Sequence, residues 1–350
     1  MEKIRFSFLF ITYKQERFVE EAFLACVNQK GDDFEIVISD DCSPDNTYQL
    51  LEHLVVDYRN NGGNIPITLN RNEKNLGIGG NFQKAAELSR GEWLLMAAGD
   101  DVSLPCRLDS VRKIVKDYPN IYGISTARYF VDENGQNPRY NFKPDYLLGA
   151  DAVWKRDVFT MFRPLDGRVM SEDHVLFLRA LLLGGMVQVN TPTINYRISS
   201  QNYSIRHSKS IIESKQAEVK KINYHIELLR FRLDDLMDWE KKGHYTELMD
   251  KAKEKIEQEI EELIKQKESY NLFLDIAHGN LVKKLTYIFT PSQVWLHNNV
   301  FYRLYNLMKM SGVIDYKPKR KTDWQEGEVI QDYRTITMKD FVSQNQTTLF

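Results

Sequence analysis

The sequence has few cysteines, no excess of charge and no long apolar run. Its 350 residues include three cysteines, Cys26, Cys42 and Cys106, and none belongs to a C-x-x-C pair. This pattern excludes a disulfide scaffold and a zinc cluster, and it favours a reducing compartment. The 47 Lys and Arg residues nearly balance the 49 Asp and Glu residues. We therefore expect no general affinity for nucleic acid.

Membrane-spanning and secretion segments are also missing from the sequence. No run reaches the roughly 18 apolar residues that a spanning helix needs. Residues 6–11 are apolar and follow charged residues, but the run is short and lacks a small-residue cleavage site. It therefore predicts a buried strand rather than a signal peptide, and we expect a cytoplasmic protein.

The first 110 residues alternate strand and helix patterns. Strands are expected at about 5–12, 34–39, 65–69 and 93–96, with helices from about 16, 45 and 80. This order predicts an α/β fold of the Rossmann-like type, with a mainly parallel sheet flanked by helices. A mixed stretch follows, with strands at about 121–131 and 186–198 around a helix at 172–184. We place the catalytic domain at residues 1–208.

The composition changes after residue 208. Apolar residues recur at heptad spacing from Val219 to Leu236, the pattern breaks at residues 241–244, and a second amphipathic run extends from Met249 to Leu263. Residues 209–270 therefore predict a helical hairpin with a coiled-coil-like pattern. We expect the hairpin to pack against itself, against the main domain or against a second copy of the chain. The last arrangement would make a homo-oligomer.

Aromatic and basic residues are interleaved in the last region, 271–350, which we expect to be mostly helical. Between Lys283 and Lys321 the pattern is typical of an amphipathic helix at an anionic membrane surface, and equally of a helix packed on a domain with a solvated basic edge. In the first case residues 271–321 would place the protein at the inner face of the cell membrane. The last twenty residues form a polar tail that we expect to fray.

Pairs of acids follow two of the expected strands. Asp100 and Asp101 come after the strand at 93–96, and Asp40 and Asp41 end the strand at 34–39. Adjacent carboxylates repel unless a cation or a hydrogen-bonding ligand offsets the charge. Asp100 and Asp101 suit Mg²⁺ or Mn²⁺, or a helix cap beside a solvated acid. Asp40 and Asp41 suit a nucleotide base or ribose, or ordinary turn chemistry together with Asp45.

In combination, five motifs resemble the family 2 glycosyltransferases of the GT-A fold, over residues 4 to about 205. The motifs stand in the family's order and at its spacing, and they are Phe-Ile-Thr-Tyr-Lys-Gln-Glu at 10–16, Glu-Ile-Val-Ile-Ser-Asp-Asp-Cys-Ser-Pro-Asp-Asn-Thr at 35–47, Asn-Leu-Gly-Ile-Gly-Gly-Asn at 75–81, Gly-Glu-Trp-Leu-Leu-Met-Ala-Ala-Gly-Asp-Asp at 91–101 and Ser-Glu-Asp-His at 171–174.

The resemblance implies a nucleotide-sugar site. Asp41 would recognise the base with Asp40 in support. Arg197 would approach the donor phosphates, a place that Arg206 and His207 also suit, and an arginine in a surface ion pair fits the residues nearly as well. Asp100 would be the second acid of the metal-binding Asp-x-Asp motif with Asp101 beside it, although Ala98 replaces the first acid. The remaining residues implied at the donor are Thr12, Tyr13, Glu16, Asn75, Gly77 and Asn81.

The resemblance also implies a catalytic base. In an inverting displacement a carboxylate takes the proton of the acceptor hydroxyl, and Asp173 resembles that base with Glu172 beside it. From the residues alone, the same pair is an acidic helix start stabilised by the helix dipole. His174 is expected at the acceptor site or on the helix surface, because no second histidine stands at metal-ligand spacing.

The function expected from this resemblance is an inverting, metal-dependent transfer of a sugar. The donor would be a nucleotide-diphosphate sugar, most simply a UDP-sugar, and the acceptor a saccharide or lipid-linked saccharide in surface polysaccharide synthesis. A nicotinamide dehydrogenase is excluded, because the glycine-rich segment does not follow the first strand. The competing hypothesis is an inactive relative that binds a nucleotide or glycan and organises an assembly through its hairpin. Ala98 supports that alternative, whereas the four retained acids oppose it.

Overall fold

The computed structural model describes residues 4–142, 149–198, 211–277 and 333–343, and the chain groups into two compact units. One unit contains Met1–Ser199, Asp234–Met249 and Gln325–Phe350, and the other contains Ser200–Leu233 and Asp250–Trp324. No helix among the described residues is long and apolar enough to cross a membrane. Arg206, His207 and the basic and aromatic stretch 283–321 lie outside the described residues.

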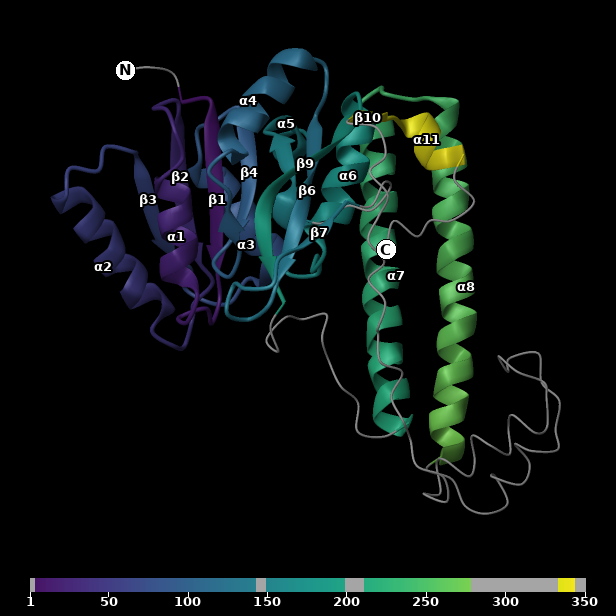
Figure 1. Cartoon of the computed structure of the whole chain (residues 1–350). Helices are drawn as coiled ribbons and strands as arrows, with labels where there is room; N and C mark the ends of the chain where they lie inside the picture. The colour runs from purple at the N-terminus through teal and green to yellow at the C-terminus, as the bar shows by residue number, and fades with distance from the viewer. Residues whose placement is uncertain (1–3, 143–148, 199–210, 278–332, 344–350) are drawn as a thin grey trace. The chain divides into compact units, whose positions relative to one another are not determined.

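A single sheet organises the first unit (Figure 1). The strands β1, β2, β3 and β4 run parallel, as the sequence predicts. Short β5 and β7 pair with β9 and β6 off the main path. Along that path the strands are β10 (Tyr333–Ile336), β9 (Met186–Arg197), β6 (Gly123–Val131), β8 (Val153–Lys155), β4 (Trp93–Ala98), β1 (Phe6–Thr12), β2 (Phe34–Asp40) and β3 (Ile67–Arg71), with β5 at Val102–Ser103 and β7 at Arg139–Asn141.

Helices cover the parallel part of the sheet on both faces. Side chains of α1 (Val19–Val27), α2 (Thr47–Asn60) and α4 (Arg107–Asp117) share one apolar cluster with Phe8 of β1 and Ile36 of β2. The helix α3 (Gly77–Leu88) contacts β1 and β2 but contributes nothing to that cluster, so it covers the opposite face. Because the sheet is covered on both faces, every residue of β2 and every residue of β1 except Ile11 is buried.

Antiparallel pairing turns the chain back beside β4. In the β4–β8 register, Leu95 lies opposite Val153, and Met96 N donates to Ala152 O at 3.1 Å. The short 3-10 helix η1 (Gly149–Asp151) directly precedes β8 and therefore lies beyond the carboxyl end of β4. After β8 the chain forms α5 (Asp157–Thr160) and α6 (Glu172–Leu183), which leads into β9.

The expectation of a frayed tail is wrong for residues 333–343. The strand β10 pairs antiparallel with residues 186–189 of β9, and α11 (Met338–Ser343) follows it. Phe341 of α11 is 3 % exposed and lies edge-on to Phe177 of α6, with ring centroids 6.4 Å apart. A few apolar residues in a polar background are enough to dock this segment, because their burial is favourable and the strand pairs its backbone.

Two long helices form where the heptad pattern predicts them. They are α7 (Ile211–Lys241) and α8 (Glu247–Ala277), and residues 242–246 form the non-helical connection between them. In the second unit the heptad residues Ile222, Ile226 and Leu229 of α7 and Ile256 of α8 are buried. The end of the hairpin, residues 234–249, belongs to the first unit, where Trp239 stacks on Phe162 with ring centroids 4.9 Å apart.

Candidate active site

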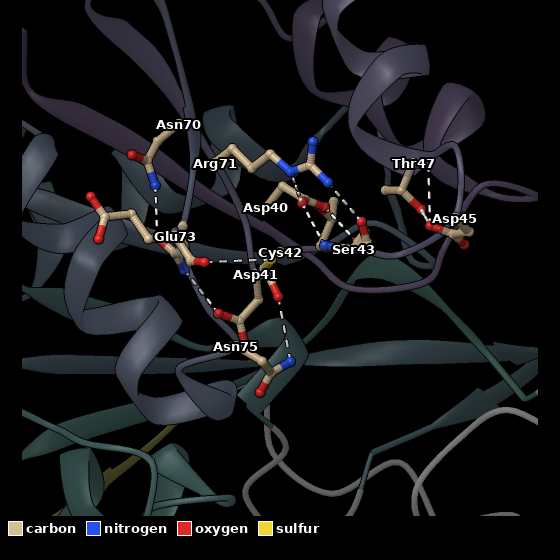
Figure 2. A network of polar contacts seen from close by, with 12 residues as sticks. Asp40, Asp41, Cys42, Ser43, Asp45, Thr47, Asn70, Arg71, Glu73 and Asn75 are labelled. Atoms are coloured by element: carbon tan, nitrogen blue, oxygen red, sulfur yellow. Dashed lines mark hydrogen bonds and ion pairs between the residues drawn. The ribbon is translucent and has the colours of Figure 1, made fainter.

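Asp40 closes the turn after β2. Its Oδ1 accepts hydrogen bonds from Thr12 Oγ1 at 3.0 Å and Ser43 Oγ at 2.6 Å, and its Oδ2 accepts one from Ser43 N at 2.8 Å. Arg71 approaches the same carboxylate in Figure 2, with Nε 3.9 Å from Oδ2. The Asp40 side chain is fully buried. In this structure Asp40 therefore does the turn chemistry that the sequence leaves open, and it fixes Thr12 at the end of β1.

Asp41 holds the N-terminal end of α3. Its Oδ1 accepts from Leu76 N at 2.7 Å and its Oδ2 from Gly77 N at 2.9 Å. Asn75 Nδ2 donates to the backbone oxygen of Asp41 at 3.4 Å (Figure 2). Gly77 has φ of +76°, a conformation that glycine adopts without strain. Hydrogen bonds thus bring together Asp41, Asn75 and Gly77, three of the residues that are expected to contact the nucleotide-sugar donor.

Asn81 and Glu16 also bond within the protein. Asn81 is 2 % exposed; its Nδ2 donates to Ser39 O and its Oδ1 accepts from Asn72 Nδ2, each at 2.9 Å. Exposed Glu16 accepts from Asn46 N at 2.9 Å at the start of α2. These bonds show two residues that support the loops around the strand ends. Direct contact of either residue with the nucleotide-sugar donor stays a prediction.

Tyr13 presents an aromatic ring at the carboxyl end of β1. Its side chain is 42 % exposed, and Lys14 Nζ lies 5.1 Å from the ring centroid. Lys14 has φ of +57°, which is uncommon for a residue other than glycine. An exposed ring beside a cation is a suitable surface for a nucleotide base, because bases stack on aromatic side chains.

Asp100 and Asp101 follow the end of β4. Asp100 Oδ1 accepts from Gln15 Nε2 at 2.8 Å, and Asp101 Oδ1 accepts from Arg197 N at 2.9 Å. Burial raises the pKa of the Asp100 carboxyl. Burial raises the pKa of Asp101 further above its usual range, with an added contribution from the Asp100 charge. Burial therefore disfavours the charged form of both carboxyls unless a cation or a hydrogen-bond donor stabilises it.

Arg197 holds the Asp100–Asp101 turn from the end of β9. Its guanidinium donates from Nε to Asp100 O at 3.0 Å, from Nη1 to Glu133 O at 2.8 Å and from Nη2 to Glu21 Oε2 at 2.5 Å. The Arg197 side chain is 2 % exposed. The sequence did not indicate these contacts, which give Arg197 a positioning role. Its contact with donor phosphates stays a prediction.

Glu172 and Asp173 begin α6 and are 6 % and 8 % exposed. Asp173 Oδ2 accepts from Gly149 N at 3.0 Å, and His174 Nε2 lies 3.6 Å from Asp173 Oδ1. Burial, followed by the charge of Asp173, raises the pKa of Glu172 well above its usual range. His174, predicted at the acceptor site or on the helix surface, is therefore a direct neighbour of Asp173.

Both acid pairs lie at the same edge of the sheet. Asp100 and Asp101 follow the carboxyl end of β4, and η1 lies beyond that same end, where its Gly149 binds Asp173. The carboxyl edge of a parallel sheet is where α/β proteins bind ligands. The chain thus places two carboxylate pairs, from segments about 70 residues apart, at the edge where α/β proteins bind ligands.

Sequence reasoning missed Gln15 and Arg107. Arg107 is 1 % exposed, and its Nη2 donates to Met96 O at 2.6 Å and to Ala150 O at 3.1 Å. No pattern in the sequence distinguishes a buried arginine from an exposed one at the start of an amphipathic helix, so no signal could have found it. Gln15 lies inside the motif at residues 10–16, and its place in that motif could have indicated that it lies near the site.

The carboxylate oxygens of Asp100 and Asp101 are suitable ligands for a hard divalent cation. Carboxylate oxygens are the ligands that Mg²⁺ and Mn²⁺ prefer, and one or two carboxylates plus phosphate oxygens and water complete such sites. The described part of the chain contains no group of three or more His, Cys, Asp or Glu side chains that could hold a metal alone. A cation at Asp100 and Asp101 would therefore share its coordination with a phosphate-bearing ligand.

Comparison with known proteins identifies the family. Residues 7–175 match the model of glycosyl transferase family 2. This segment belongs to that family. The family 2 segment contains both acid pairs, and it is a glycosyltransferase domain.

Relatives of this family 2 segment come from several organisms. An uncharacterized glycosyltransferase of Methanocaldococcus jannaschii is 32% identical over 146 residues, which cover 41% of this chain and 48% of the relative. An uncharacterized glycosyltransferase of Haemophilus influenzae is 30% identical over 115 residues, covering 33% of this chain and 36% of the relative. The aligned part thus spans half or less of these relatives.

Two solved structures share the fold. S. aureus TarS 1-349 in complex with UDP-GlcNAc has a TM-score of 0.50 and 16% identity, covering 87% of this chain and 89% of that one. The mannosyltransferase PcManGT from Pyrobaculum calidifontis, in complex with GDP-Man and Mn²⁺, has a TM-score of 0.50 and 13% identity, covering 89% and 87%. These likenesses confirm the GT-A type of α/β fold that the sequence predicts.

Proposed function

We propose that this chain is an inverting glycosyltransferase that moves a sugar from a nucleotide-diphosphate donor, a UDP-sugar, to a saccharide or lipid-linked saccharide. The observation that carries the proposal is the placement of two acid pairs, Asp100–Asp101 and Glu172–Asp173, at one edge of the family 2 domain. The structural neighbours bound to UDP-GlcNAc and GDP-Man support a nucleotide-sugar donor.

In this proposal Asp173 is the general base. Its carboxylate takes the proton of the acceptor hydroxyl as that oxygen attacks the anomeric carbon, and the nucleotide diphosphate leaves from the opposite face. The Gly149 N–H bond to Oδ2 fixes the orientation of the carboxylate. Burial raises the pKa of Glu172 well above its usual range, which favours its neutral form and reduces the charge beside the base.

The donor would lie across the ends of β1, β2 and β4. Tyr13 provides an exposed ring for the base. Asp41 accepts one hydrogen bond on Oδ2 from Gly77 N, and a carboxylate oxygen has a second acceptor position for an N–H of the base. Thr12 and Asn75 lie in the same network and complete the proposed nucleotide pocket.

Asp100 and Asp101 would hold Mn²⁺ or Mg²⁺. When bound, the cation would neutralise charge on the donor diphosphate as it leaves. The burial that raises the pKa values of both carboxyls supports this assignment, because a bound cation would stabilise the charged form that burial disfavours. The position of Ala98, in place of a further acid, makes these two carboxylates the protein's ligands in the proposal.

The organisation outside the family 2 segment is also proposed. Residues 1–208 would be the catalytic domain, 209–270 a hairpin able to form a homo-oligomer, and 271–350 a C-terminal region that meets a membrane surface through 271–321. The heptad pattern supports the second proposal and the interleaved bases and aromatics support the third. The protein would then work in the cytoplasm or at the inner face of the membrane.

The test is sugar transfer and donor hydrolysis with a panel of nucleotide sugars, with and without Mn²⁺. We expect turnover that requires the cation, and a loss of about 100-fold or more in kcat for Asp173→Asn, because general-base catalysis contributes about 10²–10⁴-fold. Asp109→Asn, an exposed carboxyl on α4, is the matched control and should keep full activity. Full activity in Asp173→Asn removes this residue from the base role, and no turnover with any donor favours the inactive-relative hypothesis.

A further inference from the structure

We infer that Arg107 is a positioning residue that sets the distance between the two halves of the proposed catalytic site. The inference rests on the proposed function and goes beyond it, because Arg107 belongs to neither acid pair. One nitrogen of its guanidinium, Nη2, donates to Met96 O of β4 at 2.6 Å and to Ala150 O of η1 at 3.1 Å. It thereby joins the strand that leads to Asp100 to the turn that orients Asp173.

The surroundings of Arg107 keep the guanidinium in one place. Its side chain is 1 % exposed, its Nη1 donates to Ser103 Oγ at 3.0 Å, and its Cζ lies 5.8 Å from the ring centroid of Phe8. A planar guanidinium with five donors can bond several carbonyls in a fixed geometry, which the single ammonium of lysine cannot reproduce. Burial of such a cation is costly unless its bonds are retained.

Each side of this link leads directly to a functional carboxylate. On the β4 side, Met96 precedes Asp100 by four residues at the end of the strand. On the η1 side, Gly149, the residue before Ala150, donates to Asp173 Oδ2 at 3.0 Å. A shift of about 1 Å in the position of a catalytic group costs on the order of 100-fold in rate. Loosening the link should therefore lower turnover more than nucleotide binding.

The chain offers a matched control at the opposite end of β4. Arg156 also bonds the backbone, from Nε to Gly91 O at 2.7 Å and from Nη1 to Ala86 O at 3.1 Å. Both contacts precede the first residue of β4, whereas Arg107 bonds Met96 near the end of that strand. Arg156→Lys therefore removes a similar set of backbone bonds, to the end of α3 and the turn before β4, away from both acid pairs. It should cost stability but leave kcat unchanged.

The experiment compares Arg107→Lys with Arg156→Lys by hydrogen exchange and by steady-state kinetics. We expect Arg107→Lys to speed amide exchange at residues 96–101 and 149–152 by about 10-fold or more, and Arg156→Lys to speed it only at 86–93. In transfer assays we expect Arg107→Lys to lower kcat by about 100-fold while the affinity for UDP changes by less than about 2-fold.

The two readouts separate this inference from the proposed function. Unchanged exchange at residues 149–152 in Arg107→Lys overturns the positioning role, whatever the wild type does in a transfer assay. An equal loss of kcat in both lysine variants overturns it as well. A wild type without turnover on any donor contradicts the proposed function, whereas exchange that rises on both sides of the link in Arg107→Lys still supports the link itself.

Discussion

Asp151 shows how a single buried carboxyl supports the turn beside the site. It is fully buried at the end of η1, where Oδ1 accepts from Ser125 Oγ at 3.0 Å and Thr126 N at 3.2 Å, and Oδ2 lies 2.9 Å from Arg128 Nε. Burial raises the pKa of Asp151 from 3.8 to about 6 despite the Arg128 charge. The residue that anchors η1 therefore changes charge at mildly acidic pH.

This pKa predicts the pH dependence of stability. Because the folded-state pKa is above the unfolded value, the folded protein binds more protons between about pH 4 and 6, so the contribution of Asp151 to the free energy of unfolding falls as the pH rises through that range. Relative to Asp151→Asn, the wild type should lose up to about 3 kcal/mol between pH 3 and 7. Urea unfolding at several pH values measures this difference.

The control for this measurement has the opposite sign. Asp132 is exposed, and the hydrogen bond from Gln136 N, with that from Asn137, lowers its pKa. Relative to Asp132→Asn, the wild type should gain stability as the pH rises and should not lose it. If Asp151 behaved like Asp132, its ion pair with Arg128 would outweigh its burial, and the predicted direction would be wrong.

For single residues, the sequence predicts the place of a polar side chain in the fold better than it predicts the role of that side chain. Asp40 and Asn81 stand where the motifs place them, yet their bonds go to Ser43, Thr12 and Ser39 within the protein. A carboxylate that closes a turn and one that binds a ligand have the same residue type, and only the neighbours brought in by folding separate them. Arg107 was missed for the same reason.

Among the elements, α6 links the proposed base to the helical hairpin. It begins with Glu172 and Asp173, and two turns later Arg179 donates from Nε to Asp235 Oδ2 of α7 at 2.7 Å and from Nη2 to Oδ1 at 3.2 Å. Both side chains of this ion pair are almost fully buried. The end of the hairpin thus helps to hold the helix that carries the proposed base.

Removing one partner of that pair should destabilise the protein strongly. Asp235→Ala leaves the Arg179 guanidinium buried without its carboxylate, and we expect a loss of about 3–5 kcal/mol in the free energy of unfolding. Asp238→Ala, which removes an exposed partner of Lys241, should cost less than about 1 kcal/mol.

A double variant decides whether the charge itself is the cause. Arg179→Met combined with Asp235→Leu removes both charges and keeps apolar volume, so it should recover most of the stability that Asp235→Ala loses. Denaturant titration of the four proteins provides the comparison. Equal losses in Asp235→Ala and in the double variant would assign the effect to packing instead of to an unpaired charge.

The predictability of the elements follows from their length and burial. The strands β1, β2 and β4 are mostly apolar, and the heptad pattern of α7 is long, so the sequence predicts all four elements. By contrast, β8 has three residues and β10 four, which is too short for any period to emerge. Their pairing depends on partners that are distant in the sequence, and these are the strands that position η1 and cover β9.

At the scale of the whole molecule, the three cysteines lie at different depths. Cys26 is 1 % exposed in the core, and burial raises the pKa of its thiol to about 11, whereas Cys106 is exposed. At pH 8 the thiolate fraction of Cys26 is on the order of one in a thousand. Iodoacetamide should therefore label native Cys106 at least about 100-fold faster than Cys26, as peptide mass spectrometry can measure.

Unfolding in urea provides the control for this labelling. Once the chain unfolds, Cys26 and Cys106 should react at similar rates, because both thiols are then solvated with ordinary pKa values. Rapid labelling of Cys26 in the native protein would mean that the layer formed by α1 and α4 opens without global unfolding, and it would contradict the burial seen here.

The pairing of β10 with β9 has a consequence for synthesis of the chain. The ribosome makes β9 first, and β10 emerges only after both hairpin helices and the residues that follow them. At 5–20 residues per second this delay is on the order of ten seconds. During that time residues 186–189 of β9 have an unpaired edge, which is a template for other strands. Until its last strand arrives, the nascent sheet therefore exposes an edge at which other chains can pair.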